Sequence, residues 1–153
     1  MAARYTIDTQ GNIALSAGTP KTILNIINGT NALVRLIEMG VGFDGTTPTA
    51  TPITVELCKS TQATAGTSTA TTPNQTGGPT RTVQASGARG YTAEPTALTV
   101  IKRWLVHPQG LPLVVQFPLG REPEQTASAQ GLCIRCTAPA AVNVQAYMEF
   151  EEG

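Results

Sequence analysis

His107 is the only histidine in this chain of 153 residues, so it is the first candidate for acid–base chemistry. A nucleophilic serine or cysteine needs a neighbouring base, and that base needs a group to orient it. His107 directly precedes Pro108 at the end of an expected strand, and no Gly-x-Ser-x-Gly motif accompanies it. We therefore predict a hydrated or hydrogen-bonded histidine at a strand end, and no catalytic residue.

The cysteines are the next candidates, because Cys133 and Cys136 form a C-x-x-C pair. A redox pair of this kind belongs at a helix N-terminus, and a structural zinc site needs four ligands. Here the pair lies in an expected strand, where residues three apart point to opposite faces. With Cys58 the chain has an odd number of cysteines and no secretion signal, which predicts reduced thiols. We expect neither a metal nor a cofactor.

Net charge argues against nucleic acid as a partner, and the lack of long apolar runs argues against a membrane. Lys and Arg number 10 and Asp and Glu number 10, so the formal net charge is zero, whereas nucleic-acid binding needs a basic surplus. No apolar run approaches the roughly 18 residues of a membrane span.

Charged residues make up 13% of the chain, against about 25% in a typical soluble domain. Either partner proteins cover much of the surface, or Thr, Ser, Asn and Gln supply its polarity.

The pattern along the chain is typical of β-structure. Short alternating runs rich in Val, Ile and Leu are separated by 15 glycines and 11 prolines, and no long helical period occurs. About eight strands at this spacing predict a single domain, an all-β antiparallel sandwich of the jelly-roll type. The clearest expected strands are 22–27, 32–43, 53–60, 98–106, 113–117, 131–137 and 142–151.

Three segments organise the chain. Residues 1–19 are expected to be an N-terminal arm or a weak first strand, and residues 20–153 the sandwich itself. Residues 61–97 are rich in Thr, Gly and Pro and poor in large apolar residues. Since long structureless connections are uncommon in compact domains, this excursion is predicted to hold edge strands at 68–72 and 80–84. A mobile tip is expected at 74–79.

Several stretches together resemble small virion proteins of tailed bacteriophages, of the head decoration or capsid-cement type. They cover about two-thirds of the chain and follow one order. The stretches are VELCKSTQATAGTST (55–69), YTAEPT (91–96), HPQG (107–110), FPLGREP (117–123) and GLCIRCTAPAAVNVQAYMEFEE (131–152).

The resemblance implies a non-enzymatic structural protein of the virion that is assembled in the host cytoplasm and binds the capsid surface. Its expected partners are further copies of itself, in a homotrimer, and the major capsid protein. Candidate contact residues are Arg4 and Tyr5 in the arm, and Arg121 and Glu122 in the FPLGREP turn. An ion pair between Arg121 and Glu122 is the competing interpretation of that turn.

Two alternatives stay open. One is a carbohydrate-binding or host-recognition module of a tail fibre, which would need exposed aromatic residues. Aromatic residues make up 5% of the chain, and Trp104 lies on an apolar strand face, where a core position is expected. The other is a neck or tail completion protein, whose chemistry is close to that of a decoration protein.

Overall fold

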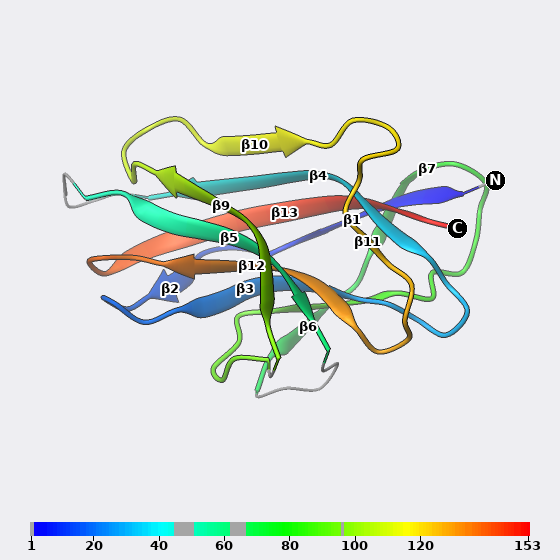
Figure 1. The fold of residues 1–153 in the computed structure, drawn as a ribbon, viewed down its shortest axis with the longest axis horizontal. Coiled ribbons are helices and arrows are strands. Elements are labelled where there is room, and N and C mark those ends of the chain that lie inside the picture. Colours follow the sequence, from blue (N-terminus) through cyan, green and yellow to red (C-terminus); the bar gives the residue numbers. More distant parts are fainter. Residues whose placement is uncertain (1, 45–50, 62–66, 96) are drawn as a thin grey trace.

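The chain folds into an antiparallel β-sandwich, seen in a computed structural model that describes residues 2–44, 51–61, 67–95 and 97–153 (Figure 1). The first sheet has the strand order β10-β4-β13-β1-β7, and the second has the order β6-β8-β3-β12-β5-β9. The described part of the chain contains no helix, and therefore none that could cross a membrane. The strands are β1 (Ala3–Asp8), β2 (Ile13–Leu15), β3 (Lys21–Ile27), β4 (Val34–Phe43), β5 (Ile53–Ser60), β6 (Thr69–Thr71), β7 (Asn74–Gly77), β8 (Ser86–Arg89), β9 (Thr99–Val106), β10 (Leu113–Gln116), β11 (Glu124–Gln125), β12 (Gly131–Thr137) and β13 (Val142–Glu152).

Eight of these strands form a jelly roll, which confirms the predicted fold class. They make two four-stranded arrays, β10-β4-β13-β1 and β3-β12-β5-β9, that pack face to face. Successive strands of the eight alternate between the two arrays, except that β5 and β9 pair within one array. This interleaving is the double Greek key of a jelly roll. The remaining strands are short additions to the sheets.

Alternation of apolar and polar residues explains most of the core. Ile53, Val55 and Leu57 of β5 point inward, as do Leu132 and Ile134 of the neighbouring β12. The pattern of β4 is less regular, because a β-bulge at Ile37 shifts its register against β13. Val34 and Leu36 lie in the core before the bulge and Met39 and Val41 after it.

The described residues of the 61–97 excursion close the side of the sandwich where the sheets end in β6 and β7. β6 adds to the second sheet through β8, close to the predicted strand 68–72. The prediction of a strand at 80–84 is wrong, and the predicted tip 74–79 contains β7, which pairs with β1. Backbone pairing with β1 decides this arrangement, since Asn74–Gly77 carries no apolar side chain.

Glu152 explains how the 80–84 segment is held without a strand. Its fully buried carboxylate accepts hydrogen bonds from the backbone N–H groups of Gln84, at 3.0 Å, and Ala85, at 2.7 Å. The Tyr5 hydroxyl also donates to the carbonyl oxygen of Arg81, at 3.2 Å. Side chains of β13 and β1 thus replace the pairing that a strand would provide.

Candidate functional site

Among the described residues, the large apolar side chains that remain exposed belong to β9, to β10 and to the loops beside them. They are Ile101 and Leu105 of β9, Leu111 in the next loop, Val114 of β10 and Leu119 in the turn that follows. We call these five residues the β9–β10 edge. Leu111 is 90% exposed and Leu119 is 94% exposed. β9 and β10 are the last strands of the second and first sheets, so both sheets end on this side (Figure 1).

The β9–β10 edge is the less protected side of the molecule. β9 has eight residues and pairs only with β5 in the described residues, so its outer row of backbone groups has no strand partner there. The other edge strands are short, since β6 has three residues and β7 and β10 have four each. Short edge strands are a common protection against strand addition, whereas a long exposed one favours contact with another chain.

The FPLGREP turn projects from this same edge. The N–H of Arg121 donates to the carbonyl oxygen of Pro118, at 2.9 Å, and Gly120 has a φ of +80°. This is the tight turn that the sequence predicts. Arg121 is exposed, Glu122 is half-buried, and neither forms an ion pair with a described residue. The competing interpretation, an Arg121–Glu122 pair, is thus not the arrangement in this chain.

The two candidate residues near the N-terminus differ in position. Arg4 is exposed on the outer face of β1, and its guanidinium group lies over Gly77 of β7. Tyr5 lies in the core instead, 2% exposed, with its ring stacked on Phe150 at 5.7 Å between centroids. Burial makes the Tyr5 side chain inaccessible to a partner, so only Arg4 remains a surface candidate. Both residues belong to β1, which lies between β13 and β7.

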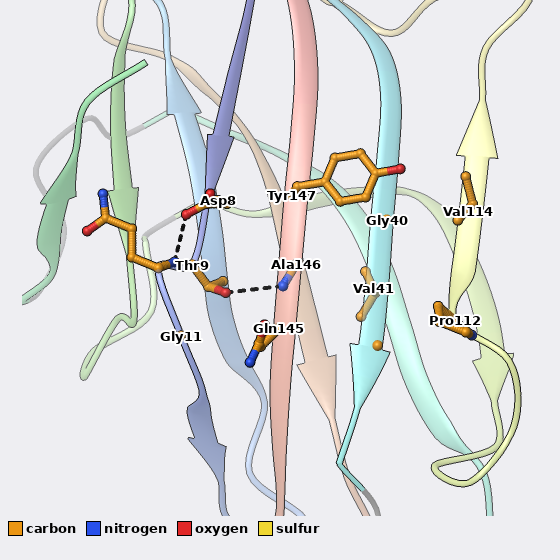
Figure 2. A pocket seen from close by; sticks show the side chains of 12 residues that line it. Asp8, Thr9, Gly11, Gly40, Val41, Pro112, Val114, Gln145, Ala146 and Tyr147 are labelled. Atoms are coloured by element: carbon orange, nitrogen blue, oxygen red, sulfur yellow. Dashed lines mark hydrogen bonds between the residues drawn. The ribbon is translucent and has the colours of Figure 1, made fainter. Parts of the chain in front are cut away.

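A groove of about 420 Å³ crosses the outer face of the first sheet (Figure 2). Its floor is β4 at Gly40 and Gly42, and its sides are Pro112 and Val114 on one side and Gln145 and Tyr147 on the other. We call this the Gly42 groove. Figure 2 shows the Tyr147 ring extending from β13 across Gly40. A β-carbon at Gly40 would lie only 2.1 Å from Cε1 of that ring.

Tyr147 is fixed by its hydroxyl group, which donates a hydrogen bond to Glu38. Glu38 also accepts a hydrogen bond from Nε2 of Gln116 on β10, at 2.6 Å. Burial, the hydrogen bond to Glu38, and the charges of Glu38 and Glu149 raise the pKa of Tyr147 to about 12. The phenol therefore stays protonated, and its ring forms one end of the groove.

The outer face of the second sheet carries a buried polar cluster. Glu56 is 6% exposed and binds Arg103 at 2.7 Å and Arg135 at 2.6 Å. Burial by itself would raise the pKa of Glu56, but the hydrogen bonds and charges of the two arginines lower it below the usual 4.5. The carboxylate is thus a structural anion that ties β5 to β9 and β12.

The residues singled out for chemistry do not come together. His107 is exposed, and its Nδ1 accepts a hydrogen bond from the N–H of Gln109 at 3.2 Å, in a strand-end turn as predicted. Cys133 and Cys136 point to opposite faces of β12, and Cys136 lies in the core, again as predicted. No group of three or more His, Cys, Asp or Glu residues suits a metal ion in the described part of the chain.

Comparison of the chain with protein-family models, with curated proteins and with solved structures gave no match.

Proposed function

We propose that this protein is a structural component of a bacteriophage virion, a decoration protein that binds the outside of the capsid through its β9–β10 edge. The observation that carries the proposal is that the exposed large apolar side chains among the described residues belong to β9, to β10 and to the loops beside them. Leu105, Leu111 and Leu119 are 72%, 90% and 94% exposed, and they lie where both sheets end. Apolar groups grouped in this way favour burial against another protein.

The proposed mechanism is stabilisation by mass action. A protein that binds the assembled shell more tightly than free capsid subunits shifts the equilibrium toward the shell. A homotrimer suits this role, because capsid lattices present local three-fold axes that a cyclic trimer can match. The low content of charged residues, 13%, supports a surface that is partly covered in the assembly.

The rigid turn at Pro118–Arg121 would add specificity to this apolar contact. It holds Leu119 at the tip and presents Arg121 beside it, with no intramolecular ion pair to compete among the described residues. A charge at the rim of an interface mainly affects association rate and partner choice. Arg121 is therefore expected to contact a carboxylate of the capsid protein.

The test is occupancy of the particle with which the protein co-purifies. The double variant Leu111→Asp, Leu119→Asp places two charges in the β9–β10 edge without touching the core. We expect occupancy, measured by cryo-electron microscopy and by protein stoichiometry, to fall at least about tenfold, since charges buried without partners cost well over 1.4 kcal/mol. Thr82→Asp is the matched control, because Thr82 is exposed and lies in the 61–97 excursion. Unchanged occupancy of the double variant, or density at the tail alone, contradicts the proposal.

A further inference from the structure

We propose that the Gly42 groove is a binding site for a neutral oligosaccharide. The starting point is Gly42 itself, a glycine in the interior of a ten-residue strand. Glycine there destabilises a strand by roughly 0.5–1 kcal/mol relative to alanine. Its φ is not positive, so the backbone does not require glycine.

Packing does not require glycine at this position either. A β-carbon at Gly42 would meet only Cβ and Cγ of Pro112, both at 3.8 Å, an ordinary contact distance. Gly40 is different, because the Tyr147 ring occupies the space above it. A glycine inside a strand, without a bulge or a crowding neighbour, often marks the close approach of a ligand.

The sides of the groove combine apolar surface with planar polar groups. The Tyr147 ring, Pro112 and Val114 supply apolar surface, on which the C–H face of a pyranose ring can pack. Gln145 and Asp8 are exposed on the β13 and β1 sides. At about 420 Å³ the groove falls within the size range of small-ligand sites, about 300–1,000 Å³.

A second hollow of about 230 Å³ extends the groove past Gly42 toward Asn12 and Asp44. Its polar residues are already ordered by one another. Nε2 of Gln145 donates to Oδ1 of Asn12 at 2.7 Å, and Nδ2 of Asn12 donates to Oδ2 of Asp44 at 3.0 Å. Ordering before binding lowers the entropic cost of holding a ligand. The amides in this row can donate hydrogen bonds to sugar hydroxyls and accept them, and the carboxylate of Asp44 can accept them.

Charge and topology exclude other ligand classes. Both hollows include an aspartate, Asp8 or Asp44, and the residues that line them include no Lys, Arg or His, which disfavours phosphates and acidic glycans. An extended peptide normally adds to a free sheet edge. The floor of this groove is β4, whose two sides are already paired with β13 and β10. A neutral, hydroxyl-rich ligand is the class that fits.

Val114 belongs to both the groove and the β9–β10 edge, whereas Leu111 and Leu119, which test the capsid contact, do not line the groove. The experiment is a glycan array of neutral, sialylated and sulfated oligosaccharides, followed by titration of a neutral hit into ¹⁵N-labelled protein. We expect binding to neutral glycans only, with shifts of the amide signals of Gly42, Gln145 and Tyr147. Gly42→Val fills the floor of the groove and should weaken binding at least about tenfold, the equivalent of 1.4 kcal/mol. Glu151→Val, on the outer face of β13 away from the groove, should bind as the wild type does.

Three outcomes would overturn the site. They are no neutral glycan bound by the wild-type protein, a preference for acidic glycans, or unchanged affinity in folded Gly42→Val. If Gly42→Val does not fold, the amide shifts of the wild-type protein decide, and shifts confined to residues outside the groove overturn it. The Leu111→Asp, Leu119→Asp variant separates the two proposals, since it should keep glycan binding whatever happens to capsid occupancy.

Discussion

Cys58 on β5 lies directly opposite Cys133 on the neighbouring antiparallel strand β12. Both side chains are buried on the outer side of the second sheet, and each thiol shifts the pKa of the other. Directly opposed residues in antiparallel strands have Cα atoms about 4.5 or 5.5 Å apart, and both distances suit a disulfide. The C-x-x-C motif therefore misleads, because the partner of Cys133 is Cys58 rather than Cys136.

Mild oxidation should join this pair and leave Cys136 free. Diamide or oxidised glutathione takes the two electrons, and the thiols lose their protons as the S–S bond forms. Its interaction with Cys58, together with burial, raises the pKa of Cys133 well above its ordinary value, whereas the interaction with Cys133 lowers the pKa of Cys58. Cys58 should therefore form the first thiolate, and the reaction should be faster at alkaline pH. Peptide mapping under non-reducing conditions gives the connectivity. Cys136→Ser should react as the wild type does, whereas a Cys133–Cys136 disulfide would contradict the assigned faces of β12.

The Glu56 cluster should make stability depend on pH in the acid range. Because the pKa of Glu56 is lower in the folded protein, its contribution is fully present above the unfolded pKa near 4.5 and is lost as the pH falls below it. We expect Glu56→Gln to cost about 1–3 kcal/mol at neutral pH. The free energy of unfolding, measured with urea between pH 7 and pH 3, values that bracket this loss, should decline less in Glu56→Gln than in the wild type.

The two arginines of that cluster should contribute unequally. The side chain of Arg103 is 64% exposed and that of Arg135 is 21% exposed. Exposed ion pairs contribute about 0–1 kcal/mol. Arg135→Ala should therefore lower the free energy of unfolding more than Arg103→Ala. Equal losses in urea unfolding would show that exposure does not distinguish the two contacts.

Gly40 and Gly42 should respond oppositely to alanine. In Gly40→Ala the new methyl group displaces the Tyr147 ring, at a cost of about 1–3 kcal/mol. Gly42→Ala should be neutral or stabilising by up to about 1 kcal/mol, because its β-carbon has room. Thermal unfolding measures both changes. Ultraviolet titration gives a second readout, since the pKa of Tyr147, about 12 in the wild type, should fall in Gly40→Ala as the bond to Glu38 is lost.

Glu152 should anchor the 61–97 excursion. Glu152→Ala leaves the backbone N–H groups of Gln84 and Ala85 without their buried acceptor, which is expected to cost about 2–4 kcal/mol. Hydrogen exchange should accelerate first at these two amides. The half-buried neighbour Glu151 points to the other face of β13 and provides the control, and Glu151→Ala should leave both protection and stability close to those of the wild type. Unchanged hydrogen exchange in Glu152→Ala would show that this carboxylate does not hold the segment in place.

Sequence reasoning reached the jelly roll because most core strands alternate without interruption. The bounds of β5 and β12 are those predicted, since their inward residues form unbroken rows. In β4 the bulge at Ile37 changes which residues point inward, so both faces of the strand look apolar in the sequence. Only the register with β13 shows which residues point inward before and after the bulge. β7 could not be predicted, because its partner β1 lies some seventy residues earlier and pairs with it through backbone groups alone.

The candidate sites were less predictable than the fold, because their residues come from segments that are far apart in the sequence. Gly40 and Gly42 are visible in the sequence, but the groove depends on Tyr147 and Pro112, which other strands place beside them. Likewise, nothing local links Cys58 with Cys133. Properties set by local alternation follow from the sequence, whereas those set by strand register require the structure.

The pairing of β1 with β13 has a practical consequence. Ala3 lies opposite Glu152, so the first and last strands end side by side (Figure 1). A few glycines could join the ends, and new ends could open at the exposed Leu119–Gly120 turn, giving a circular permutant that keeps every strand. Conversely, a cargo domain fused before β1 or after β13 would leave the molecule from one place, so the same scaffold could display cargo on a particle.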